Sequence, residues 1–275
     1  MRLSTIRTRG GTAAVRHDGD ELIEIPGAAD VGTLLADPAW RDRAVRASGD
    51  RSPTAGADFA PLVPRPEKII CVGLNYREHI LEMGRDLPEH PTLFAKFTSA
   101  LIGAHDAIVL PAQSCQMDWE AELGVVLGTP VRNADVEEAA AGIAGFTVVN
   151  DVTARDWQYR TTQWLQGKTF EHATPVGPAL VSVDEAGGTS GRLTCEVNGE
   201  MVQYADIGDL VFGPAELVAY VSQVVTLMPG DLIATGTPGG VGHARTPPRY
   251  LSDGDLVVTC IQGIGECRNA CRSAS

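Results

Sequence analysis

The chain has 275 residues, of which 44% are hydrophobic and 21% charged, proportions that are ordinary for a globular enzyme. Its 22 basic and 35 acidic residues give a net charge of −13, which repels phosphate and argues against a nucleic-acid partner. Because no run approaches roughly 18 consecutive apolar residues and residues 1–7 lack the apolar core of a signal peptide, we expect no membrane association and a cytoplasmic location.

Residues 1–60 have the pattern of a small separate unit. Two short strand-like runs flank Asp18-Gly19-Asp20, which predicts a β-hairpin. A short helix is expected in VGTLLADPAW, and the following segment, ASGDRSPTAGADFAPLVPRPEK, has the composition of a linker. We therefore expect a small N-terminal α/β unit over 1–60 and a larger β-rich domain over 66–275.

From Lys68 onward, apolar runs alternate with glycine and proline turns. Strands are expected at 69–73, 107–110, 122–127, 145–149, 179–183, 193–197, 231–235 and 255–261, and helices at 76–84, 135–142 and 214–226. Strands outnumber helices and no segment repeats at a fixed period. The predicted fold class is α+β and β-rich.

The six cysteines form no CxxC pair, and Cys71 lies inside an apolar run as a small core residue.

The segment DWEAEL places two glutamates, Glu120 and Glu122, at the start of the apolar run GVVLG. On a strand, residues i and i+2 share a face, so these carboxylates would repel each other unless a cation neutralises them. Asp151 follows another apolar, β-branched run, GFTVVN. Three carboxylates at strand ends can hold a hard divalent cation such as Mg²⁺ or Mn²⁺. Solvent-facing glutamates and a turn aspartate are the alternatives.

Two further segments carry groups suited to acid–base chemistry. In GLNYREHILEMG, His79 and Glu82 lie three residues apart, so on a helix they share a face and can form a general-base pair; a surface pair is the alternative. Lys168 follows a glycine in GKTFEHATPVGP and by itself is a weak signal. The loop TGTPGGVG lacks the ending of a Walker motif, but it can offer backbone N–H groups and the Thr237 hydroxyl to an anion.

Five segments in this order resemble the fumarylacetoacetate hydrolase family, in particular its acylpyruvate and fumarylpyruvate hydrolase branch. They are VGLNYREH, DWEAELGVVLG, NDVTARDWQ, GKTF followed by PVGP, and GDLIATGTPGGVG, and they span about residues 66–265. The resemblance implies a mixed β-sandwich roll with a small N-terminal domain, and a homodimer.

The resemblance also implies roles for individual residues. It implies that Mg²⁺ or Mn²⁺ is bound by Glu120, Glu122 and Asp151. It further implies a base dyad of His79 and Glu82, contact of Lys168 with the bound substrate or enolate, and a pocket lined by Gln158 and Thr237.

These residue types favour hydrolysis of a carbon–carbon bond in a 3-acylpyruvate, a small 2-keto acid. The keto acid would chelate the cation, Lys168 would stabilise the pyruvate enolate, and His79 would activate water. The preferred substrate is fumarylpyruvate in aromatic catabolism, with Arg160, Arg245 or Arg249 as candidates for binding a second carboxylate. Oxaloacetate decarboxylation, hydroxymuconate-type isomerisation and a catalytically silent metal-binding protein are the alternatives.

Overall fold

Strands dominate the computed structural model, which describes residues 1–82, 84, 86–188 and 190–274, with the backbone alone for His79 and Glu82. The strands are β1 (Arg2–Thr8), β2 (Gly11–Asp18), β3 (Glu21–Glu24), β4 (Arg51–Pro53), β5 (Ile69–Gly73), β6 (Thr92–Ala95), β7 (Leu101–Ile102), β8 (Ile108–Leu110), β9 (Met117–Asp118), β10 (Ala121–Leu127), β11 (Ile143–Asn150), β12 (Thr153–Ala154), β13 (Thr174–Ser182), β14 (Arg192–Val197), β15 (Glu200–Asp206), β16 (Leu232–Ala234), β17 (Leu256–Ile261) and β18 (Gly265–Ser273).

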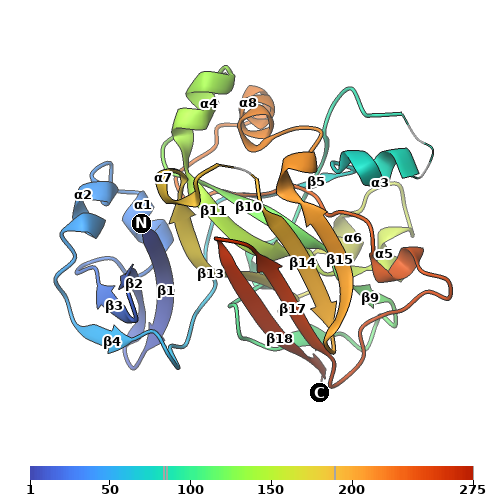
Figure 1. Ribbon diagram of the computed structural model, residues 1–275, viewed down its shortest axis with the longest axis horizontal. Helices are drawn as coiled ribbons and strands as arrows, with labels where there is room; N and C mark the ends of the chain where they lie inside the picture. Colours follow the sequence, from blue (N-terminus) through green and yellow to red (C-terminus); the bar gives the residue numbers. More distant parts are fainter. Residues whose placement is uncertain (83, 85, 189, 275) are drawn as a thin grey trace.

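The helices are short and lie around the sheets (Figure 1). The α-helices are α1 (Val31–Leu35), α2 (Trp40–Val45), α3 (Arg77–Glu82), α4 (Val136–Gly142), α5 (Arg155–Gln158), α6 (Leu165–Lys168), α7 (Val183–Ala186) and α8 (Pro214–Val224). Among the described residues, no helix combines the length and the apolar character needed to span a membrane.

Two mixed sheets form the body of the molecule. The larger has 11 strands in the order β4-β3-β2-β1-β13-β11-β10-β16-β5-β6, with β7 paired to β13, and the smaller has the order β15-β14-β17-β18-β8. The central strands β10 and β11 are buried along their whole length, and the main hydrophobic core takes residues from both sheets. This sheet-on-sheet packing confirms the predicted β-rich α+β class and the sandwich-like architecture.

The predicted elements are present, and the sequence signals explain their ends. Helix α4 begins at a capping box in which Asp135 accepts from the backbone N–H of Glu138 at 2.9 Å. Helix α8 has Pro214 at its first turn, and the side chain of Glu216 accepts from the N–H of Gly213 at 2.7 Å. These two helices pack against each other at one end of the molecule (Figure 1).

The expectations missed several strands. β18 was not predicted because its buried face consists of Cys267, Asn269 and Cys271, which are too small or too polar to give an apolar alternation. β15 is an edge strand with exposed Met201 and Tyr204, so its burial pattern does not separate two faces.

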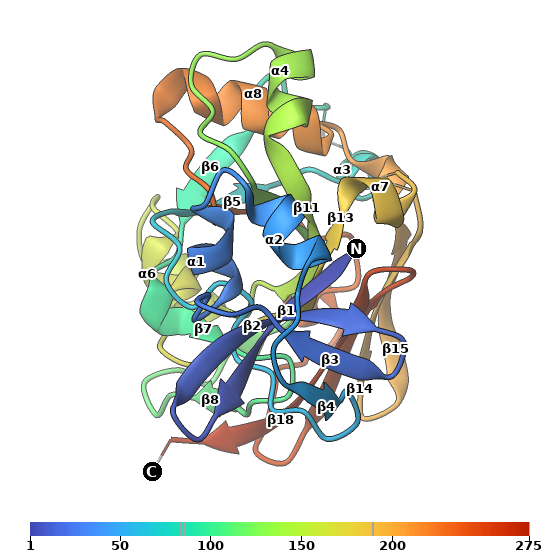
Figure 2. The same cartoon turned by 90° about the vertical axis from the view of Figure 1, so that its left-hand side faces the viewer.

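The N-terminal strands continue the large sheet. β1 pairs with β13 through Arg2–Val181 and Leu3–Leu180, so the hydrogen-bond ladder runs from residues 1–60 into the body. Figure 2 shows α1 and α2 beside these strands, and a second hydrophobic core contains residues of both parts. The division of the chain into one domain of residues 1–60 and another of residues 66–275 remains a prediction.

Candidate active site

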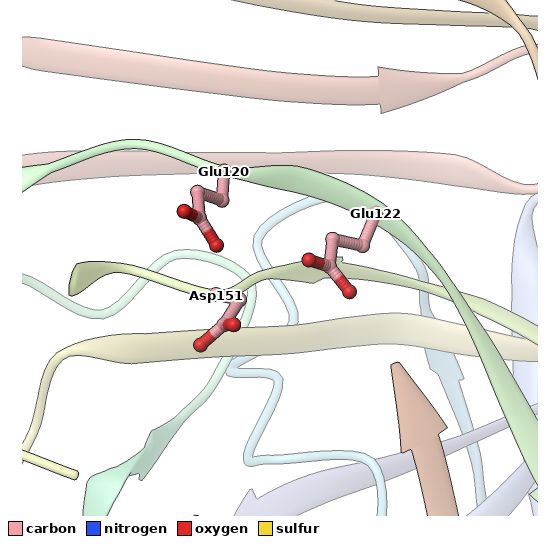
Figure 3. A group of neighbouring side chains, drawn as sticks. All are labelled: Glu120, Glu122 and Asp151. Atoms are coloured by element: carbon pink, nitrogen blue, oxygen red, sulfur yellow. The ribbon is translucent and has the colours of Figure 1, made fainter. Parts of the chain in front are cut away.

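The pairing of β10 with β11 brings the three acidic residues together. Ala121 pairs with Asn150, and the N–H of Asp151 donates to the carbonyl of Glu120 at 2.8 Å, which places the two residues opposite each other. Glu122 lies one pleat further along β10 and points to the same face. One carboxylate oxygen from each of Glu120, Glu122 and Asp151 lies within 4.8 Å of the other two, and Figure 3 shows the three side chains as neighbours, the glutamates from β10 and Asp151 from the adjacent chain segment.

Two buried lysines neutralise part of this acidic cluster. The Nζ atom of Lys168 donates to an oxygen of Glu120 and to Oδ2 of Asp151, the latter at 2.8 Å. The Nζ atom of Lys96 donates to Oδ1 of Asp151 at 2.6 Å and to the carbonyl of Val152 at 3.1 Å. The structure therefore places Lys168 beside the acidic cluster, while its contact with a substrate remains a prediction. It adds Lys96, which the sequence analysis missed because a single lysine beyond a short strand carries no distinguishing signal.

The glycine before Lys168 has a packing reason. A Cβ atom on Gly167 would lie 2.5 Å from the backbone nitrogen of Gln158 and 2.6 Å from the carbonyl oxygen of Ala154. No side chain fits there, so the absence of one lets α6 pack directly against α5. That close approach carries the Lys168 ammonium to the carboxylates.

A third buried cation, the Arg155 side chain of α5, also contacts the acidic cluster. Nη1 of Arg155 lies 2.7 Å from Oε1 of Glu120 and donates to Oε1 of Gln158 at 3.0 Å, while Nε donates to Oδ2 of Asp118 at 2.8 Å. Its Nη2 atom is buried and has no hydrogen-bond partner in the described structure. Arg155 lies within the quoted segment NDVTARDWQ, yet the sequence analysis assigned it no role; its buried donor is free for a ligand.

The protonation of the two glutamates differs because their neighbours differ. Burial would raise the pKa of Glu120, but the adjacent Lys168 and Arg155 outweigh it and lower the pKa to about 2. Burial raises the pKa of Glu122 well above its usual value, and the Asp151 and Glu120 carboxylates raise it further. Burial lowers the pKa of Lys168, but Asp151 and Glu120 outweigh it and raise the pKa.

Two members of the acidic cluster, Glu120 and Glu122, line the buried end of a cavity of about 400 Å³, and Asp151 lies beside them outside the lining. The cavity wall includes Glu120, Glu122 and Lys168, while the exposed residues Tyr159 and His243 also line it, so the cavity opens at those two residues. This volume is at the small end of the range for small-molecule sites. The cavity therefore suits a compact ligand that reaches the carboxylates.

The other predicted ligand-binding residues divide into two groups. Gln158 and Thr237 line the cavity, and the Thr237 hydroxyl donates to the carbonyl of Ala121 at 3.0 Å. Arg160 is exposed and lies over the Trp157 ring, 3.5 Å from its centroid, away from the cavity lining.

The two arginines of GHARTPPRY also lie outside the cavity lining. Arg245 and Arg249 both contact Glu200, at 3.2 and 2.7 Å. The side chains of His79 and Glu82 lie outside the described residues, and their backbone forms part of α3, which follows the cavity-lining Leu74. Their roles, and those of the three arginines, remain predictions.

The donor set fits a hard divalent cation. Carboxylate oxygens are the ligands that Mg²⁺ and Mn²⁺ prefer, and each has lone pairs beyond those used by Lys96, Lys168 and Arg155. No lysine, arginine or histidine of the described chain pairs with Glu122, which accepts only the N–H of Gly236, at 2.8 Å. With all three carboxylates ionised, the cluster carries one negative charge more than Lys96 and Lys168 neutralise, because Arg155 is shared with Asp118. A divalent cation can therefore replace the proton that the raised pKa of Glu122 otherwise favours. Glu120, Glu122 and Asp151 would hold the ion.

Comparison with known proteins places this geometry in a family. Residues 68–272 match the model of the fumarylacetoacetate (FAA) hydrolase C-terminal domain. The chain is 45% identical to the oxaloacetate tautomerase Fahd2a, mitochondrial, of Rattus norvegicus, over 81% of this chain and 72% of that protein.

Two solved structures resemble the whole chain. One is a 5-carboxymethyl-2-hydroxymuconate delta-isomerase from Mycobacterium smegmatis, with a TM-score of 0.83 and 34% identity. The other is a fumarylacetoacetate hydrolase from Exiguobacterium antarcticum, with a TM-score of 0.89 and 30% identity. Each covers 100% of both chains. The chain therefore belongs to the fumarylacetoacetate hydrolase family.

Proposed function

We propose that this protein is a divalent-metal-dependent tautomerase of a small 2-oxo acid of the oxaloacetate class. The observation that carries the proposal is the cluster of Glu120, Glu122 and Asp151 joined to Lys168 at the buried end of a compact cavity. The name of the rat relative supports the reaction type, because 45% identity extends over 81% of this chain. The preferred reaction therefore moves from the hydrolysis expected from sequence to enolisation.

Tautomerisation moves one proton between C3 of the acid and the oxygen at C2. Removal of the C3 proton leaves an enolate with negative charge on that oxygen, and protonation of the oxygen gives the enol; the reverse sequence gives the keto form. A Mg²⁺ or Mn²⁺ ion held by Glu120, Glu122 and Asp151 would supply a Lewis acid for the 2-oxo acid. The Lys168 ammonium, fixed between Glu120 and Asp151, stabilises the developing oxyanion. A preorganised donor of this kind contributes about 10²–10³-fold in rate.

Other groups on the chain orient the acid and move the proton. The unpartnered Nη2 of Arg155 can donate to the acid, and Gln158 fixes the arginine through Nη1. The C3 proton needs a base, for which we propose His79, supported by Glu82 on α3. A base in position contributes roughly 10²–10⁴-fold.

Hydrolysis of an acylpyruvate such as fumarylpyruvate is the second candidate. It uses the same stabilised enolate but adds attack of water on the distal carbonyl, and the similarity to a fumarylacetoacetate hydrolase supports it. Decarboxylation of oxaloacetate passes through the same enolate without attacking water.

A cytoplasmic location and a homodimer remain predictions of the sequence, and light scattering of the purified chain tests the predicted homodimer.

Product analysis on one preparation separates these reactions. With Mg²⁺, we expect rapid loss of the ultraviolet absorbance of enol-oxaloacetate without pyruvate release, well above the rate with Mg²⁺ alone. Pyruvate and CO₂ from oxaloacetate would identify a decarboxylase, and pyruvate with fumarate from fumarylpyruvate would identify a hydrolase. No acceleration of enol decay over free metal would refute the tautomerase.

A further inference from the structure

A histidine at the open end of the cavity, paired with a tyrosine outside the cavity lining, has no role in enolisation. His243 is exposed and lines the cavity, and its Nδ1 atom lies 2.9 Å from the hydroxyl oxygen of Tyr250. The ring of Tyr159, which is 58% exposed, lies 5.3 Å from the His243 ring, centroid to centroid. These three aromatic residues, Tyr159, His243 and Tyr250, are called the rim.

The position of the rim is fixed from below by a buried carboxylate. Oδ1 of Asp118 accepts from the N–H of Gly242 at 2.7 Å, and Oδ2 accepts from the N–H of His243 at 3.0 Å. The same Oδ2 accepts from Nε of Arg155 at 2.8 Å. The fully buried side chain of Asp118 therefore fixes the position of His243 relative to Arg155, which lines the cavity.

The loop that bears His243 is also closely packed. A Cβ atom on Gly242 would lie 1.9 Å from the carbonyl oxygen of Arg249, and the N–H of Arg249 donates to the carbonyl of Gly242 at 3.0 Å. The loop folds back on itself at this glycine. Such packing holds a binding side chain in one place, which is what selective recognition requires.

The rim offers one unpaired hydrogen-bond donor whichever tautomer His243 adopts. A neutral imidazole has one N–H group and a phenol has one O–H group, and only one of them is used in the bond between the two residues. If Tyr250 donates, Nε2–H of His243 is left; if His243 donates, the Tyr250 hydroxyl is left. Within the described part of the chain, neither group has another partner.

The charges along the cavity indicate which group this donor meets. Among the residues whose side chains are described, the acidic residues that line the cavity are Glu120 and Glu122, both buried, and neither belongs to the rim. An anionic acceptor forms a stronger hydrogen bond than a neutral one. This inference rests on the proposed function, which places the 2-oxo acid group at the buried end of the cavity. The opposite end of the substrate then lies at the rim.

We infer that the rim is the subsite for a second carboxylate, and that His243 selects 2-oxo dicarboxylates over 2-oxo acids with a neutral far end. The selected group is the carboxylate on C4 of a four-carbon acid. His243 is thus a specificity-determining residue, and Tyr250 orients it.

Direct binding of a matched pair of ligands tests this subsite apart from turnover. The probes are 3,3-difluorooxaloacetate, which has no C3 proton and cannot enolise, and its 4-ethyl ester. Each is titrated by calorimetry into the Mg²⁺-loaded protein. Because a hydrogen bond to a charged group is removed, His243→Leu should weaken binding of the diacid about 10–100-fold and lower its preference over the ester by the same factor.

Two further variants keep the test sharp. His243→Gln retains a donor and should restore a substantial part of the preference, while His105→Leu, at an exposed histidine remote from the cavity lining, should leave it unchanged. An equal loss for both probes, or no loss for either, would overturn the inference. If the wild-type protein prefers the diacid through His243 but does not tautomerise oxaloacetate, the proposed function fails and the subsite stands.

Discussion

Asp118 and Arg155 form a buried ion pair, with Nε of the arginine 2.8 Å from Oδ2 of the aspartate. Burial would lower the pKa of Arg155, but Glu120 and Asp118 outweigh it and raise the pKa, so the guanidinium stays charged. From the described residues Asp118 accepts four hydrogen bonds, two of them from the backbone N–H groups of Gly242 and His243. The pair therefore links the acidic cluster to the cavity rim.

Replacement of Asp118 by Asn should destabilise the fold strongly. The change removes the charge that balances Arg155 and puts an NH₂ group where an acceptor is needed, and breaking a buried pair typically costs about 3–5 kcal/mol. Urea unfolding measures the loss. In a double-mutant cycle with Arg155→Gln, the second change should cost much less in the Asp118→Asn background; fully additive losses would contradict the coupling.

Divalent metal should stabilise the folded protein through Glu122. When ionised, the three carboxylates carry more negative charge than the two lysines neutralise, which favours a divalent cation. A cation that binds only the folded state adds about 2.7 kcal/mol at a concentration of 100 times its Kd. Thermal unfolding with Mg²⁺ or with a chelator measures the shift in Tm. Glu122→Gln should remove most of that shift, and Glu137→Gln, at an exposed position on α4, should keep it. The same shift in both variants would rule out binding at Glu122.

Loss of the Lys168 ammonium should lower the turnover rate without weakening the binding of metal. Lys168→Met removes the charge that faces the developing oxyanion and should lower kcat for enol-oxaloacetate by about 10²–10³-fold. It also removes a cation from beside Glu120 and Asp151, so the Kd for Mg²⁺ should not rise. Metal titration and steady-state kinetics on the same sample separate the two effects. Unchanged kcat, or loss of metal binding alone, would exclude the role assigned to Lys168.

Acidification from pH 6.5 to about 4 should lower the free energy of unfolding because of His17. Burial, with a smaller contribution from Arg2, lowers the pKa of His17 to about 4 from its usual 6.5, while Glu185 opposes the shift. The unfolded chain then binds more protons than the folded one in this range, so acidification favours unfolding by about 2–3 kcal/mol at pH 4.

Urea unfolding from pH 4 to 7.5 checks the contribution of His17. Because Ser4 Oγ lies 2.7 Å from Nε2 of His17, His17→Gln keeps a group able to bond Ser4 but cannot titrate, and its stability should depend less on pH. His105→Gln, at an exposed position, should follow the wild type. Identical pH profiles for His17→Gln and the wild type would contradict this assignment.

The sequence was sufficient for the apolar strands of the core and for the position of the acidic cluster, but not for β15 or β18. Apolar runs bounded by glycine and proline turns are local signals, and they located β5, β10, β11 and β17; the structure then showed capping residues at the starts of α4 and α8. The i, i+2 spacing of Glu120 and Glu122 required a common face, and the position of Asp151 at the end of β11 placed it at a strand end. These features depend on backbone geometry within a few residues.

The cationic and aromatic parts of the site depended on contacts between segments far apart in the sequence. Lys96 reaches Asp151 across 55 residues, and Asp118 contacts His243 across 125 residues. No local spacing encodes such meetings; they follow from the pairing register of the strands and from the close approach that Gly167 and Gly242 permit. Sequence alone thus determined which residues must be neutralised, and tertiary packing decided which cations do so and what stands at the mouth of the cavity.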